Sequence, residues 1–116
     1  MMFIEIKYEK NNLLAALLGM QSFGFALADV TQDVKDNLKQ GHKISFRFKE
    51  NSIQTAANLI QHEKGIKVII DKNVDTKMSF PINLRDQDFL TYLDVTTQRL
   101  GLRYEVLDTK TIRVYQ

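Results

Sequence analysis

Residues Ile44–Asp71 read ISFRFKENSIQTAANLIQHEKGIKVIID and hold the clearest pattern in the chain. Apolar and polar residues alternate over Ile44–Phe48, which predicts a strand with one apolar face. The polar run Lys49–Asn51 predicts a turn, and apolar residues at helical spacing in Ser52–Lys64 predict an amphipathic helix. Gly65 stands where a left-handed residue that ends a helix is expected, ahead of a second apolar run. The stretch therefore predicts a strand–helix–strand unit.

The ends of this unit allow two finer predictions. The helix is expected to begin after Asn51 or Ser52, and Asn51 as the cap would place Gln54 in a capping box. The run Val68–Ile70 is β-branched and shows little alternation. Such runs are typical of strands covered on both faces, so we expect this strand in the centre of its sheet.

A second unit of the same order follows at Met78–Val106. It has a short strand that contains Ser79, a helix that Asp88 can cap, and Gly101 after that helix. Residues Leu84–Gln87 are expected to connect the strand to the helix. The second unit therefore repeats the strand–helix–strand order of the first.

The chain closes with a predicted β-hairpin, because the alternating strand Thr111–Tyr115 follows the turn residues Asp108–Lys110. The full order is β-α-β-β-α-β-β, which predicts an α+β fold with two helices packed between small mixed and antiparallel sheets. Pro81, the only proline, interrupts the third strand and cannot donate to a ladder. That strand is therefore expected at a sheet edge, which is an opening for strand addition by a partner.

The N-terminal region is expected to be an export signal. Leu13–Ala28 carries no charge and ends in Ala26-Leu27-Ala28, the small-x-small pattern that signal peptidase needs. Residues 1–28 therefore predict a signal peptide. The alternatives are a buried helix of a cytosolic domain and a membrane anchor, although the run is short for a span of about 20 residues.

A polar leader, residues 29–42, is expected between the signal peptide and the domain. Val30, Val34 and Leu38 lie four residues apart, which places them on one face of a helix. A short helix that ends near Gly41 and a solvated linker fit this segment equally well.

The composition limits the chemistry of the chain. It has 116 residues, a net charge of +2 and no cysteine, which indicates one small domain and excludes disulfides, thiolate metal sites and a cysteine nucleophile. Two histidines, His42 and His62, are too few for a histidine-based metal cluster. Asp86 and Asp88 flank a helix start, where capping explains them better than a catalytic dyad. We therefore predict no catalytic, cofactor-binding or metal-binding residue.

Two further patterns have simpler structural explanations. Asp71 and Asp75 lack the central glycine and alternating acids of a calcium loop, so a turn is the better interpretation. The basic residues around Phe46 and Phe48 could bind a single nucleic-acid strand, but the two aromatic residues fit the inner face of the strand. The nearly neutral charge of the chain argues against nucleic acid as a partner. A small-molecule substrate is not expected either.

Residues Lys43–Gln116 resemble the short N-terminal domain shared by secretins and TonB-dependent receptors. Its most specific features here are Gly65 followed by Val68-Ile69-Ile70-Asp71, and Leu90, Leu93 and Leu100-Gly101-Leu102 followed by Tyr104. The matching segments are ISFRF, SIQTAANLIQHEKG, IKVIID, MSFPINLRDQDF, LTYLDVTTQRLGLRYEV and TIRVYQ. These positions define the fold, so they identify a fold family and no catalytic centre.

The resemblance implies a non-enzymatic periplasmic module in an envelope machine, near or on the outer membrane. Because Gln116 follows the last strand directly, we expect a free-standing domain protein or a fragment of a longer one. The leading hypothesis is an accessory subunit of a secretin-type secretion, conjugation or pilus system, whose partner is a secretin or an inner-membrane component. Assembly into a ring or another homo-oligomer is compatible with this class.

Two alternatives to the secretion role stay open. One is a signalling domain that engages an anti-sigma regulator, as in TonB-dependent transducers. The other is a small cytosolic ligand-binding or RNA-binding domain, which requires the N-terminal apolar run to be structural.

The predicted docking edges are the strands Ile44–Lys49 and Lys77–Asn83. Arg47, Lys49 and Lys77 are expected to steer the partner by charge. The complete set of predicted docking residues is Ile44, Arg47, Lys49, Lys77, Phe80 and Pro81.

Overall fold

A computed structural model of the chain describes residues 30–116, and the predicted signal peptide lies outside this range. The described part begins with a helix at residues 30–39. The elements that follow are β1 (Ile44–Ser52), α2 (Ile53–Lys64), β2 (Lys67–Ile70), β3 (Ser79–Gln87), α3 (Phe89–Arg99), β4 (Arg103–Asp108) and β5 (Thr111–Tyr115). The predicted α+β class and the order β-α-β-β-α-β-β are confirmed, with one helix added before them.

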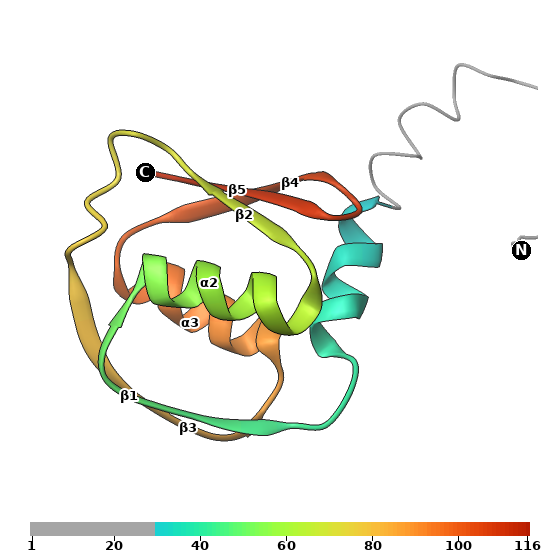
Figure 1. The fold of residues 1–116 in the computed structure, drawn as a ribbon, viewed down its shortest axis with the longest axis horizontal. Helices are drawn as coiled ribbons and strands as arrows, with labels where there is room; N and C mark the ends of the chain where they lie inside the picture. The colour runs from blue at the N-terminus through green and yellow to red at the C-terminus, as the bar shows by residue number, and fades with distance from the viewer. Residues whose placement is uncertain (1–29) are drawn as a thin grey trace, which may run out of the picture.

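The strands form two small sheets with the helices α2 and α3 between them (Figure 1). One sheet is the antiparallel pair β1–β3, and the other is mixed, with the strand order β2-β5-β4. In the mixed sheet, β2 runs parallel to β5, and β4 runs antiparallel to it. The predicted arrangement of two helices between a mixed and an antiparallel sheet is therefore confirmed.

The position predicted for β2 is wrong. It lies at the edge of the mixed sheet, and β5 occupies the centre. Lys67 and Ile69 are exposed on the outer face, with Ile69 38% accessible, while Val68 and Ile70 pack against the core from the inner face. The β-branched run therefore reflects strand propensity and not burial on both faces.

The strands β1 and β3 are longer than predicted. The expected turn Lys49–Asn51 belongs to β1, and the expected connection Leu84–Gln87 belongs to β3. The register shifts twice along the pair, so extra residues are accommodated in bulges instead of ending the strands. Asp86, in the irregular stretch opposite Ile44–Phe46, has a positive φ of 52°.

Both central helices have the predicted end signals. Ser52 caps α2, because its side chain accepts from the backbone N–H of Thr55 at 3.1 Å, and the capping box on Asn51 and Gln54 does not form. Asp88 caps α3 by accepting from the N–H of Thr91 at 2.8 Å. The glycines that follow the two helices are both left-handed, Gly65 with a φ of 67° and Gly101 with a φ of 70°.

Aromatic side chains attach the β1–β3 sheet to α3. Phe46 of β1 is 1% exposed and stacks on Tyr92, with ring centroids 4.3 Å apart and an interplanar angle of 6°. Phe89 meets Phe46 edge-on at 5.1 Å. This cluster joins one sheet to the helix layer, whereas Ile112 and Val114 of β5, both fully buried, join the other sheet to it.

Residues 30–39 form the short helix and not the solvated linker. Val34 and Leu38 are 1% and 0% exposed and belong to the single hydrophobic core. The segment after the helix is attached to α2, because Lys64 Nζ donates to the carbonyl of Gln40 at 2.6 Å. The core therefore includes residues that the predicted boundary at 43 assigned to a polar leader.

Candidate functional site

The outer face of the β1–β3 sheet holds two of the predicted docking residues, Arg47 and Lys49, together with Arg85. Arg47 and Lys49 on β1 and Arg85 on β3 are exposed, and none of them forms an ion pair with another residue of the described chain. Arg47 lies directly opposite Asn83 of β3. Exposed cations that no acid neutralises are available to an acidic partner.

Three other predicted residues surround this face. Ile44, at the start of β1, is 36% exposed. Pro81 is exposed in β3, opposite the irregular stretch of β1 that follows Phe48. Lys77 is exposed but precedes β3, in a turn where its backbone N–H donates to Asp75 Oδ1 at 2.9 Å.

Phe80, the remaining predicted docking residue, does not present its side chain to the outer face. Its side chain points to the core and is 8% exposed. The guanidinium of Arg99 lies over its ring at 4.7 Å from the centroid, which covers the ring further. Phe80 therefore holds β3 on the helix layer.

A buried polar cluster joins β1 to α3. Asn51, which is 0% exposed, donates from Nδ2 to Thr96 Oγ1 at 3.0 Å and accepts from the hydroxyl of Tyr92 at 2.6 Å. The sequence did not reveal this role, because strict alternation from Phe46 and Phe48 would place Asn51 on the outer face, and one extra residue in β1 between Phe48 and Asn51 turns it inward. The cluster is fully enclosed, so its role is to fix the sheet on α3.

A charged cluster lies on the outer face of the mixed sheet. Arg113 of β5 donates two hydrogen bonds to Asp71, at 2.9 and 2.6 Å, and one to Glu105 of β4. Its guanidinium also lies over the ring of Tyr115 at 4.7 Å. The bonds to Asp71 and then to Glu105 raise the pKa of Arg113. Because Asp71 is engaged in this way, it is a structural partner of Arg113 and not part of a calcium loop.

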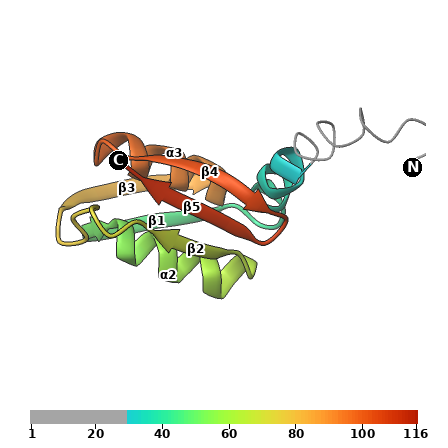
Figure 2. The same cartoon turned by 90° about the horizontal axis from the view of Figure 1, so that it is seen from above.

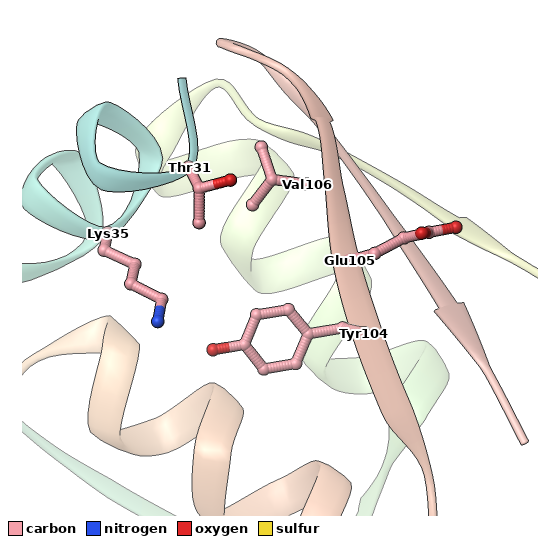
Figure 3. A pocket seen from close by; sticks show the side chains of 5 residues that line it. All are labelled: Thr31, Lys35, Tyr104, Glu105 and Val106. Carbon is pink, nitrogen blue, oxygen red and sulfur yellow. The ribbon is translucent and has the colours of Figure 1, made fainter. Parts of the chain in front are cut away.

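A shallow groove of about 380 Å³ lies between the helix of residues 30–39 and β4 (Figure 3). Lys35 and Tyr104 point toward each other across it, while Glu105 projects from the other side of β4. The hydroxyl of Tyr104 donates to Asp94 at 2.7 Å. Lys35 is therefore the charged group that this groove offers to a ligand.

A second groove, of about 320 Å³, runs between β1 and α2. Its apolar lining comes from Phe48 and Leu59, and its polar lining comes from Thr55, Asn58 and His62. Figure 2 shows α2 on the side of β1 that is away from β3. The groove therefore lies beside the unpaired edge of β1.

Within residues 30–116, no group of three or more histidine, aspartate or glutamate side chains is placed to hold a metal ion. No helix of that range is long and apolar enough to cross a membrane.

Alkaline pH is expected to destabilise the fold. Burial raises the pKa of Tyr92, and burial together with the hydrogen bond to Asp94 raises the pKa of Tyr104. In the unfolded chain both phenols have a pKa of about 10, so above that pH the unfolded chain binds fewer protons than the folded one. The free energy of unfolding should therefore fall as the pH rises from 10 to 12, while these phenols contribute no slope at pH 7–9.

Urea unfolding followed by circular dichroism at a series of pH values measures this effect. The Tyr104→Phe variant should show a shallower fall above pH 10 than the unchanged protein. An identical pH dependence in both proteins would contradict the role of Tyr104.

Comparisons of the chain with protein-family models, curated proteins and solved structures find no match. The resemblance to the short N-terminal domain of secretins and TonB-dependent receptors therefore stays a prediction from the sequence.

Proposed function

We propose that this protein is a protein–protein interaction module that docks its partner on the β1–β3 sheet. The observation that supports this most is the set of exposed cations on that sheet, Arg47, Lys49 and Arg85, which form no ion pair within residues 30–116. These cations lie beside strand edges whose N–H and C=O groups have no partner strand among residues 30–116. An acidic extended segment would satisfy both the charges and the edge.

The place of this module in the cell is proposed from the sequence resemblance. We assign it as a non-enzymatic accessory subunit of a secretin-type secretion, conjugation or pilus machine in the periplasm. The signal-like run Leu13–Ala28 supports export. The signalling alternative predicts a different partner, an anti-sigma regulator, which the capture experiment below distinguishes by the identity of the captured protein.

The test is capture of partners from envelope extracts with an affinity-tagged chain and identification by mass spectrometry. The double variant Arg47→Glu and Lys49→Glu should recover at least tenfold less partner than the unchanged chain. Lys67→Glu with Lys110→Glu is the matched control, because it makes the same charge change on exposed residues of the mixed sheet and its hairpin. Equal recovery with the first double variant would refute docking on β1.

Export is tested separately by the mass of the native protein in cell fractions. Cleavage after Ala28 predicts a mature chain that begins at Asp29 in the periplasmic fraction. A protein that retains Met1 and stays in the cytoplasm would contradict the periplasmic assignment and favour the cytosolic alternative.

A further inference from the structure

We infer that the groove between β1 and α2 is a peptide-binding site. Its occupant is an extended segment of a partner protein, which adds as a strand to the free edge of β1. In that segment acidic residues alternate with apolar ones. This inference rests on the proposed docking role of the β1–β3 sheet and deepens it by naming the edge, the groove and the chemistry of the segment.

The groove and the edge lie together in the way that strand addition requires. Phe48 of β1 and Leu59 of α2 are half-buried and form an apolar floor. Thr55, Asn58 and His62 of α2 form a polar wall, and a hollow of about 300 Å³ at Asn58, Gln61 and His62 continues it. A strand that lies between this wall and β1 would bond to the edge and place alternate side chains on the floor.

The other three sheet edges in the described part of the chain are less suited to a partner strand. The edge strand β3 contains Pro81, which has no N–H, and an irregular stretch with Asp86 at a positive φ. The edge strand β2 has four residues. The edge strand β4 faces the helix of residues 30–39, since Thr31 and Lys35 line one groove together with residues 104–106.

The pattern of the peptide follows from the two faces of β1. Arg47 points outward from the sheet and Phe48 points inward, so residues of an added strand opposite them face outward and inward in turn. An outward acid would pair with Arg47, and Lys49 adds positive charge on β1. Glu50 is the one acid on β1, and it lies in the irregular stretch between Phe48 and Asn51. An inward valine or leucine would contact Phe48 and Leu59.

The probe is a fluorescent, end-blocked peptide of eight residues in which glutamate alternates with valine and leucine. Its affinity for the full chain is measured by fluorescence anisotropy, and its position by amide chemical-shift changes. Binding should be saturable, should weaken with added salt, and should shift amides of β1 and α2. Shifts confined to β2 and β5, or no saturable binding, would overturn the inference.

Three control peptides separate the parts of the recognition. A peptide of the same composition with its glutamates in one block tests the alternation, and a peptide with lysine in place of glutamate tests the charge. A peptide with alternate amides methylated on the edge-facing side tests the backbone bonds. Each should bind at least tenfold more weakly, and equal binding of the methylated peptide would exclude strand addition.

The variant Asn58→Trp fills the groove without removing a core side chain, because Asn58 is exposed on α2. It should weaken peptide binding at least tenfold. Gln98→Trp places the same side chain on an exposed position of α3 and should leave binding unchanged. Unchanged binding by Asn58→Trp would show that the groove is not the site.

Partner capture with the same variants distinguishes this inference from the proposed function. Loss of the envelope partner with both Arg47→Glu/Lys49→Glu and Asn58→Trp supports both. Loss with the charge variant but not with Asn58→Trp keeps docking on the sheet and refutes the groove. A dimer in sedimentation that Asn58→Trp dissociates would instead make a second copy of the chain the occupant and overturn the peptide assignment.

Discussion

Replacing Asn51 by alanine is expected to lower the free energy of unfolding by about 3 kcal/mol. The change removes two hydrogen bonds at once and leaves the buried hydroxyl of Tyr92 without its acceptor, while Thr96 loses a donor. Each buried polar group left unpaired costs about 1–3 kcal/mol, because it has given up water for no replacement. The small cavity at a position that is 0% exposed adds to the loss.

Urea unfolding at neutral pH measures this loss, and three variants define its origin. Tyr92→Phe removes one of the two bonds and should cost about 1–2 kcal/mol. The double variant should lose less unfolding free energy than the sum of the two single variants, because the hydrogen bond that both variants remove can be lost only once. Asn58→Ala changes an exposed asparagine and should have little effect. A loss below about 1 kcal/mol for Asn51→Ala would show that the cluster does not hold β1 on α3.

The ends of the helices could be predicted from the sequence because their signals are local. A hydroxyl or carboxylate that accepts from an N–H three residues later needs no distant contact, and Ser52 and Asp88 both do this. The same holds for Gly65 and Gly101, whose backbone conformation a side chain would strain. The order of the elements followed from these signals and from the hydrophobic period.

The order of the strands within the mixed sheet could not be predicted in this way. The central strand β5 alternates, with Thr111, Arg113 and Tyr115 on its outer face, which is a pattern typical of a half-exposed edge strand. In the centre of the sheet, Arg113 bonds to Asp71, which is distant in the chain, and to Glu105 of β4. The pairing of β5 with both β2 and β4 is a long-range feature that no local pattern encodes.

Only the part of the candidate docking surface that depends on local alternation could be predicted from the sequence. Arg47 and Lys49 follow from the alternation of β1 and lie on the exposed face as expected. Phe80 was chosen because it lies in the predicted docking edge with Pro81, but its side chain belongs to the core and Arg99 covers its ring. The groove between β1 and α2 depends on how the helix packs beside the sheet edge, and the sequence alone does not fix that packing.

Replacing Leu38 by alanine is expected to lower the free energy of unfolding by about 3 kcal/mol. Leu38 is 0% exposed and belongs to the same core as the central helices, although it lies in a segment whose composition suited a solvated linker equally well. Truncating a fully buried leucine removes apolar contacts and leaves a cavity that the neighbours fill only in part. For a domain whose total stability is about 5–15 kcal/mol, this loss would be a large fraction.

Lys39→Ala is the matched control, since Lys39 is the exposed neighbour of Leu38 in the same helix. If residues 30–39 pack on the core, urea unfolding should give the two alanine variants free energies of unfolding that differ by most of the expected loss. Equal midpoints would mean that the helix contributes nothing to the core. A loss confined to Leu38→Ala would place the start of the folded domain before residue 43, because a solvated leader cannot lose stability when its leucine is shortened.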